Sequence, residues 1–361
     1  MYLALRRKAS TTWDVLMVSI ASLFKHALAG LLVSTTCLFG LTTHAETVQE
    51  LRIGVQFGLG YLPFHVADRA GFLTSRMREQ GIEPVPVRIV QLAGGPQMND
   101  GLLSGTLEIV SGGYTAMMVF CEKTRGAGDK QFLGISALAS VPYDLFSVDP
   151  ELKTLKDIDV QRDKIGVPSI KVSVPAVYLQ MAAEQLYGPG KQTTLDVATV
   201  SLSQPDGATS LLSGGSTVNG YMFSPPFIQQ MAGKPGIRRV WSSNELFGSP
   251  ATALVTWTTE KFHRENPKLF AAIVAAMKDA MNLISDDPKR AAAIYIAAEH
   301  SKLPPDLLIA ALADKASLRY TLAPEQSMKI AGFLHRVGGL KSPPAQWKDL
   351  FFPEIHGESG S

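Results

Sequence analysis

Glycines follow the first strand-like run of this sequence, and their spacing is similar to that of a phosphate-binding turn. The run LRIGVQF, at residues 51–57, is followed by Gly58, Gly60 and a stretch expected to be helical. A strand, the spacing G-x-G-x-x-G and a helix would bind the pyrophosphate of a dinucleotide. Pro63 stands where the third glycine of the fingerprint would be. Its ring occupies space that the fingerprint needs to be free of a side chain. The stretch therefore does not predict a dinucleotide site.

Other motifs of enzymes also lack a residue that their chemistry needs. The run GPGKQT at 188–193 is similar to a P-loop, but Gln192 stands where Ser or Thr would hold magnesium, and Gln185 replaces the first glycine. The histidines after residue 45 show no H-x-H or H-x-x-x-H spacing, and no G-x-S-x-G occurs. We therefore expect no catalytic residue, no bound metal and no cofactor.

One device does recur: small or hydroxylic residues stand between a strand-like run and a helix-like run. Free N–H groups and the positive dipole end at a helix start can bind an anion without an arginine. Each such turn taken alone is also explained as a turn former or N-cap. Five of them together predict a cleft lined by backbone donors and hydroxyls. Their residues are Phe57, Gly58, Leu59, Gly60 and Tyr61; Gly94 and Gly95; Gly113, Tyr114 and Thr115; Ser169, Lys171, Val172 and Ser173; Phe223 and Ser224.

Two kinds of ligand fit these turns. A small organic anion would meet the helix that follows Pro168, where Ser169 and Ser173 offer hydroxyls and Lys171 a positive charge. An aromatic cationic or neutral solute would instead stack on rings such as Tyr61 and would want a carboxylate. The five turns contain no acidic residue, which favours the anion.

The elements that position these turns alternate along the first two thirds of the chain. Helix-like stretches such as 98–103 and 174–186 separate short runs rich in β-branched residues, which predict strands at 51–57, 85–91, 107–111, 131–138, 144–148, 164–167, 195–200 and 220–223. This alternation predicts an α/β fold with one or two mainly parallel sheets. After about Trp257 we expect helices only, several of them opened by proline, and a disordered tail at 357–361.

The N-terminal residues differ from the rest. Lys25 leads into the apolar run 27–41, and Thr43-His44-Ala45 follows, which predicts a signal peptide at residues 1–45 with cleavage after Ala45; a signal anchor is the alternative. These 45 residues hold four of the 34 Lys and Arg and one of the 32 Asp and Glu, so the remainder carries a net charge of −1. That charge argues against nucleic-acid binding. Cys121 is the one cysteine that remains after cleavage, so no internal disulfide is expected.

Several stretches, taken in order, resemble a known family. They are GVQFGLGYLPFHVADRAGFL, AGGPQMNDGLLSGTLEIVSGGYT, GVPSIKVS, the SPP turn, FHRENPKLFAAIVAAMKDA and LKSPPAQWKDLFFPE. The chain resembles the periplasmic solute-binding proteins of ABC importers in the nitrate, sulfonate and taurine group, whose fold thiamine-precursor binders share. Glu108 stands where the family more often has Asp.

The resemblance implies a two-lobed fold of type II, in which each lobe is a sheet flanked by helices. Lobe one would comprise 51–139 and 247–356, and lobe two 140–246. The five turns would bind one small solute between the lobes. A periplasmic monomer that delivers its solute to an ABC permease and its ATPase is the function implied.

Two other classes of function share features with this sequence. Pyrimidine-forming enzymes of the thiamine pathway resemble this family, but they use a cysteine-rich motif and are cytosolic, which the single Cys121 and the export signal oppose. A sensor module that reports its ligand to a membrane receptor is equally compatible with the sequence.

Overall fold

The computed structural model describes residues 48–361, which form one compact unit. The predicted signal peptide and its cleavage after Ala45 lie outside the described residues. Within residues 48–361, no helix is long and apolar enough to cross a membrane.

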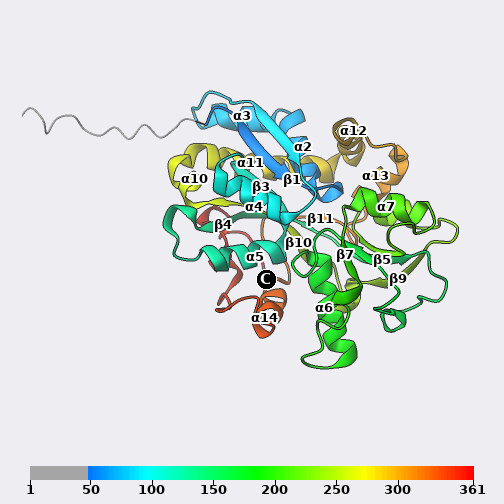
Figure 1. The fold of residues 1–361 in the computed structure, drawn as a ribbon. Coiled ribbons are helices and arrows are strands. Elements are labelled where there is room, and N and C mark those ends of the chain that lie inside the picture. Colours follow the sequence, from blue (N-terminus) through cyan, green and yellow to red (C-terminus); the bar gives the residue numbers. More distant parts are fainter. Residues whose placement is uncertain (1–47) are drawn as a thin grey trace, which may run out of the picture. The chain divides into compact units, whose positions relative to one another are not determined.

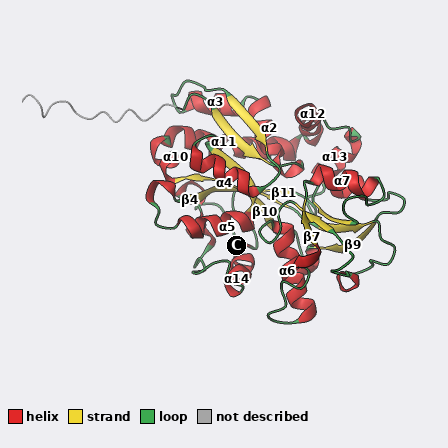
Figure 2. Ribbon diagram, viewed as in Figure 1, coloured by secondary structure: helices red, strands yellow, loops and turns green. Residues whose placement is uncertain are grey.

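The first sheet has six strands in the order β11-β4-β10-β3-β1-β2. Strand β1 pairs in parallel with β2 and β3, whereas β10 and β11 pair antiparallel with their neighbours. The central strands β3, β4 and β10 are almost fully buried because helices cover both faces (Figure 2). The bounds are β1 Leu51–Val55, β2 Val87–Gln91, β3 Ile109–Gly113, β4 Phe132–Ser140, β10 Thr252–Thr259 and β11 Arg319–Tyr320.

The second sheet has five strands in the order β7-β6-β8-β5-β9. Strand β6 pairs in parallel with β7 and β8, and β5 pairs antiparallel with β8 and β9. All five strands lie between residues 140 and 246, the range predicted for lobe two, and are drawn mainly in green in Figure 1. The bounds are β5 Asp144–Ser147, β6 Ile165–Val167, β7 Thr199–Ser201, β8 Gly220–Phe223 and β9 Arg238–Ser242. We call residues 144–242 the second-sheet part. The first-sheet part comprises residues 48–140 and 252–361, and the crossovers 141–143 and 243–251 connect the two parts.

The fold class is confirmed as α/β with two sheets flanked by helices, but three details of the prediction were wrong. Both sheets are mixed rather than mainly parallel, because the chain leaves the first sheet through β4 and returns through β10, and each crossing reverses the strand direction. Strands also do not vanish after Trp257: β10 continues to Thr259, and β11 adds a short edge strand. The predicted strand list also omitted β9 and β10.

Helices connect the strands and form most of the last third of the chain. Their bounds are α2 Leu62–Arg69, α3 Phe72–Glu79, α4 Gly95–Ser104, α5 Tyr114–Thr124, α6 Val174–Tyr187, α7 Gln204–Leu212, α8 Phe227–Met231, α9 Asn244–Phe247, α10 Glu260–Glu265, α11 Pro267–Asp286, α12 Pro288–Glu299, α13 Pro305–Ala313 and α14 Ser327–Arg336. The 3-10 turns are η1 Leu59–Tyr61, η2 Gly128–Lys130, η3 Leu155–Asp157, η4 Asp196–Ala198, η5 Trp347–Leu350 and η6 Pro353–Ile355.

The starts of the late helices follow the capping chemistry read from the sequence. Thr259 accepts a hydrogen bond from the Phe262 N–H at 3.1 Å, and Asp287 accepts one from the Arg290 N–H at 2.9 Å. Proline at the first helical position opens α11, α12 and α13, where its missing N–H costs nothing. Helix α11 packs its apolar face against α2 and α3. These helices therefore hold the elements around β1 in place.

The C-terminal residues, for which the sequence predicts a disordered tail, make hydrogen bonds with the start of α14 and with the preceding loop in the structure. The Ser361 N–H donates to the Pro324 carbonyl at 2.8 Å, and the Ser327 N–H donates to the Ser361 carbonyl at 2.7 Å. The start of α14 has unpaired backbone donors, and the last residues satisfy one of them. Composition alone, rich in Gly and Ser, did not reveal this docking.

Candidate functional site

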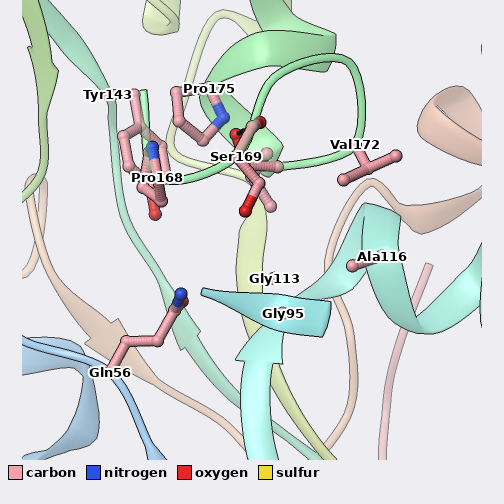
Figure 3. A pocket seen from close by; sticks show the side chains of 11 residues that line it. Gln56, Gly95, Gly113, Ala116, Tyr143, Pro168, Ser169, Val172 and Pro175 are labelled. Atoms are coloured by element: carbon pink, nitrogen blue, oxygen red, sulfur yellow. Dashed lines mark hydrogen bonds between the residues drawn. The ribbon is translucent and has the colours of Figure 1, made fainter. Parts of the chain in front are cut away.

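A small pocket lies where the first-sheet and second-sheet parts meet (Figure 3). Its volume of about 20 Å³ leaves room for roughly one water molecule. None of the residues that line it carries a charged side chain. The lining consists of Gln56, Gly95, Gly113, Ala116, Tyr143, Pro168, Ser169, Val172, Ser173, Val174 and Pro175.

Three helices begin at this pocket. Helices α4, α5 and α6 follow β2, β3 and β6, and the lining includes Gly95 at the start of α4, Gly113 just before α5, and Val174 at the start of α6. Each helix is at least 10 residues long, so each has a full macrodipole with its positive end at the pocket. The first N–H groups of a helix have no intrahelical partner. The site therefore has a positive potential without a cationic side chain.

Some polar groups predicted to bind a ligand already have protein partners. The Gln97 side chain accepts a hydrogen bond from the Gly94 N–H at 3.1 Å. The Ser173 hydroxyl donates to the Ser169 carbonyl at 2.6 Å and does not cap its own helix. In this rotamer the Ser173 hydroxyl can accept a hydrogen bond at the pocket but has no proton to donate there.

Direct hydrogen bonds join the two parts around the pocket. The Thr115 hydroxyl donates to the Val172 carbonyl at 2.7 Å. The Leu59 N–H donates to the Pro225 carbonyl at 3.1 Å, and the Gln204 side-chain amide donates to the Phe57 carbonyl at 3.3 Å. The structure is therefore that of a closed arrangement, in which the two parts contact each other on several sides of the pocket.

Two glycines permit this close approach. A Cβ on Gly94 would lie 2.9 Å from the Ser169 hydroxyl oxygen, across the boundary between the parts. Gly58 has φ +119°, and a Cβ there would lie 3.0 Å from the Pro225 carbonyl oxygen. Gly60 has another role, because a Cβ there would lie 2.3 Å from Leu254 in strand β10. The first two therefore serve the contact between the parts, and Gly60 serves packing within the first-sheet part.

The predicted site residues divide into three groups. Gly95, Gly113, Ser169, Val172 and Ser173 line the pocket. Phe57, Gly58, Leu59, Gly94, Thr115 and Ser224 lie beside the pocket in contacts between or near the two parts. Gly60, Tyr61, Tyr114, Lys171 and Phe223 lie outside the lining.

The structure does not bring two of the predicted aromatic rings to the pocket. Tyr114 is fully buried with its ring centroid 5.9 Å from that of Phe351, on the core side of α5. Phe223 stacks on Tyr221 at 4.4 Å inside the second-sheet part. Lys171 is exposed, with φ +65°, and does not line the pocket either. Stacking by these rings and a charge from Lys171 are therefore not features of the observed lining.

The prediction missed two polar residues of the lining, Gln56 and Tyr143. Gln56 directly follows β1, and its polarity at a strand end was a signal that could have been used. Tyr143 lies in the first crossover, and nothing in its local sequence distinguishes it. Burial raises the pKa of Tyr143, and a hydrogen bond with Ser224 opposes part of that rise, so its hydroxyl stays protonated.

Within residues 48–361, no group of three or more His, Cys, Asp and Glu residues could hold a metal ion. His65 instead pairs with Glu299 at 2.9 Å, and His263 pairs with Glu354 at 2.7 Å. Both imidazoles therefore have protein partners.

Comparison with known proteins identifies the family to which this chain belongs. A family model described as the NMT1-like family matches residues 44–298, well over half of the chain. The chain belongs to the NMT1-like family. Comparison with curated proteins found no significant match.

Solved structures similar to this NMT1-like protein are solute-binding proteins. The nitrate-binding protein NrtA from Synechocystis PCC 6803 has a TM-score of 0.65 and 14% identity, and the match covers 83% of each chain. The alkanesulfonate-binding protein SsuA from Xanthomonas axonopodis pv. citri has a TM-score of 0.58 and 16% identity, with 79% of this chain and 89% of that chain covered.

A third similar structure is the ligand-binding component of an ABC-type import system from Staphylococcus aureus, solved with zinc bound. Its TM-score is 0.61 at 17% identity, and the match covers 86% of this chain and 98% of that chain. At these identities the likeness concerns the fold. The resemblance seen in the sequence is confirmed, and the chain has the fold of periplasmic binding proteins.

Proposed function

We propose that this protein is the solute-binding component of an ABC importer and that it captures a small organic anion at the pocket between its two parts, which must separate and widen the pocket from the closed arrangement described above to admit the solute. Lobe one would comprise residues 51–139 and 247–356, and lobe two residues 140–246. The similar solved structures are binding proteins rather than enzymes, which supports a function without catalysis. The solute would pass unchanged to a permease and its ATPase.

The convergence of α4, α5 and α6 on one uncharged pocket carries this proposal. Each helix start favours a negative charge by about 0.3–1 kcal/mol at an exposed site and by up to about 2 kcal/mol when partly buried. Three starts together favour an anion over an isosteric neutral solute without any ion pair. The same positive potential would repel a cationic solute. No carboxylate in the lining would offset that repulsion.

The proposed cellular setting is the periplasm. The expected signal peptide at residues 1–45 and the net charge of −1 that remains after its removal support export of a protein that binds no nucleic acid. Sequencing the N-terminus of the periplasmic protein tests this, and a chain that begins at or near Glu46 is the expected result. A membrane-bound chain that retains residues 27–41 would show an anchor instead.

A binding screen tests the function. Purified protein is heated with methanesulfonate, taurine, nitrate, acetate or benzoate, and with methanesulfonamide, aminopyrimidines and methylammonium as neutral or cationic comparators. A ligand present at a hundred times its dissociation constant stabilises the folded state by about 2.7 kcal/mol. We expect at least one anion to raise the melting temperature and to be recovered chemically unchanged. Binding of only neutral or cationic compounds, or recovery of an altered compound, would refute the proposal.

A further inference from the structure

Gln56 is the polar side chain that the first-sheet part extends into the pocket. It follows the last residue of β1, and Figure 3 shows its amide directed toward the space between Gly113 and Pro168. Its Nε2 donates to the Ala93 carbonyl at 3.3 Å, and its Oε1 accepts from the Tyr61 hydroxyl at 3.0 Å. Both ends of the amide are therefore held by the first-sheet part.

These two contacts determine which way the amide faces. A backbone carbonyl can only accept a hydrogen bond, so the atom beside Ala93 must be the amide nitrogen. The oxygen then lies beside Tyr61, and the phenol must donate to it. Tyr61 is 3% exposed, and burial raises its pKa well above the usual range, with the neighbouring Tyr143 adding to the rise. The phenol thus keeps its proton across the physiological range and holds the amide in one orientation.

The amide nitrogen has two hydrogens, and Ala93 uses one of them. The other is available on the pocket side. The oxygen, which could have accepted a hydrogen bond from a ligand, is engaged by Tyr61. A solute at the pocket therefore meets a donor from Gln56.

We propose that Gln56 is a specificity-determining residue of the site and that Tyr61 is its positioning residue. Together they present an N–H donor to the solute, so that the site accepts a compact oxyanion head and discriminates against the same head when an acceptor oxygen is replaced by an N–H group. This inference rests on the proposed function and adds to it the residues that read the charged group. The sequence had suggested Tyr61 as a stacking ring, and its hydroxyl contact with Gln56 assigns it a different role.

Methanesulfonate and methanesulfonamide are a matched probe pair for this inference. They have nearly the same shape, but the second is neutral and carries two N–H donors in place of one oxygen. Dissociation constants for both are measured by titration calorimetry for the wild type, Tyr61→Phe, Gln56→Glu and the control Tyr221→Phe. Tyr221 is a suitable control because it is a fully buried phenol that donates to the Leu202 carbonyl at 2.7 Å, away from the pocket.

In Tyr61→Phe the amide loses the partner that holds its oxygen and becomes free to rotate. We expect the preference for methanesulfonate over methanesulfonamide to fall about three- to tenfold, because methanesulfonate binds more weakly and methanesulfonamide does not. Loss of structure alone would weaken both probes equally. Tyr221→Phe should leave the ratio of the two dissociation constants at the wild-type value.

In Gln56→Glu a carboxylate faces the anion at neutral pH. We expect methanesulfonate to bind at least about tenfold more weakly at pH 7, the effect of losing one hydrogen bond to a charged group. Affinity should partly return as the pH falls through the carboxyl pKa, because protonation removes the repulsion between the carboxylate and the anion. Methanesulfonate itself stays ionised throughout, and the wild type should show no such pH profile.

The outcomes separate the two proposals. If the wild type binds neither probe, or binds only methanesulfonamide, the donor role of Gln56 is refuted. If in addition no anion binds in the screen described above, the proposed function fails with it. If the wild type binds methanesulfonate but the Tyr61→Phe ratio stays unchanged, or Gln56→Glu binds without pH dependence, the inference about this pair is wrong while the proposed function stands.

Discussion

The hydrogen bond from Thr115 to the Val172 carbonyl should control how readily the two parts separate. Thr115 is fully buried in the first turn of α5, and Val172 lies in the loop before α6. The contact is 2.7 Å long and crosses from the first-sheet part to the second-sheet part. Thr115→Val keeps the side-chain shape and removes only the donor, so it perturbs this contact with little change in packing.

The size of the shift follows from the hydrogen bonds that Thr115 and the Val172 carbonyl make in the separated and closed states. In the separated state both groups bind water, so the wild type gains the usual net value of a hydrogen bond on closing, about 0.5–1.5 kcal/mol. The closed state of Thr115→Val forfeits that gain. At 1.4 kcal/mol for each factor of ten, the equilibrium between separated and closed states should shift about two- to twelvefold toward separation.

Amide hydrogen exchange at Leu59 measures this shift. Its N–H donates to the Pro225 carbonyl across the same boundary at 3.1 Å, so it exchanges when the parts separate. In Thr115→Val the protection of the Leu59 amide should fall by the same two- to twelvefold factor. The matched control is Thr209→Val, since Thr209 donates to the Pro205 carbonyl at 3.0 Å within α7 and touches no boundary.

Unchanged protection of Leu59 in Thr115→Val would show that the contact does not contribute to closure. An equal fall in Thr209→Val would show that general destabilisation, and not the contact between the parts, explains the result. Comparison of the melting temperatures of both variants further distinguishes loss of this contact from general destabilisation.

Two other substitutions have clear expected outcomes. Gly94→Ala places a methyl group 2.9 Å from the Ser169 hydroxyl oxygen, which must rotate away or shift, so it should disfavour closure by about 1 kcal/mol, and small-angle scattering should show a larger radius of gyration. Gly95→Ala is the control because its methyl group would meet Ala116 at an ordinary 3.9 Å, and equal scattering from the two variants would contradict the argument. Burial raises the pKa of Asp144 despite hydrogen bonds from Ser242 and Arg239, so its ionised form costs stability as the pH rises above the pKa of the unfolded chain. Asp144→Asn should therefore melt at a higher temperature than the wild type at pH 7, with the difference shrinking toward pH 4; a gap that persists at pH 4 would rule out this cause.

Local chemistry was sufficient to predict where most elements begin. A helix that follows a strand starts with small or capping residues, and these are visible in the sequence at Gly94, Gly113 and Ser173. In an α/β unit such a helix start lies at the carboxyl end of the preceding strand, which is where ligands bind. The sequence therefore indicated several of the loops that line the pocket, and the family resemblance indicated the fold.

The side chains that face the pocket could not be predicted in the same way. Around Gly113, the sequence offered Tyr114 as the prominent ring, but α5 turns that ring toward Phe351 and presents Ala116 to the pocket. One residue along a helix rotates the side chain by about 100°, so the direction depends on how the whole helix packs. Gln56 and Tyr143 had no motif to mark them for the same reason.

The sequence by itself determined the α/β class, the glycine turns, the helix starts and the absence of charged residues from the loops that line the pocket, apart from Lys171. These properties depend on residues close together in the chain. Only the tertiary structure decided that α4, α5 and α6 begin at one pocket, that Lys171 lies outside it, and that Tyr61 orients Gln56. These features require the carboxyl edges of two sheets to face each other across the crossovers at 141–143 and 243–251. That arrangement comes from packing between residues far apart in the sequence, which no local pattern records.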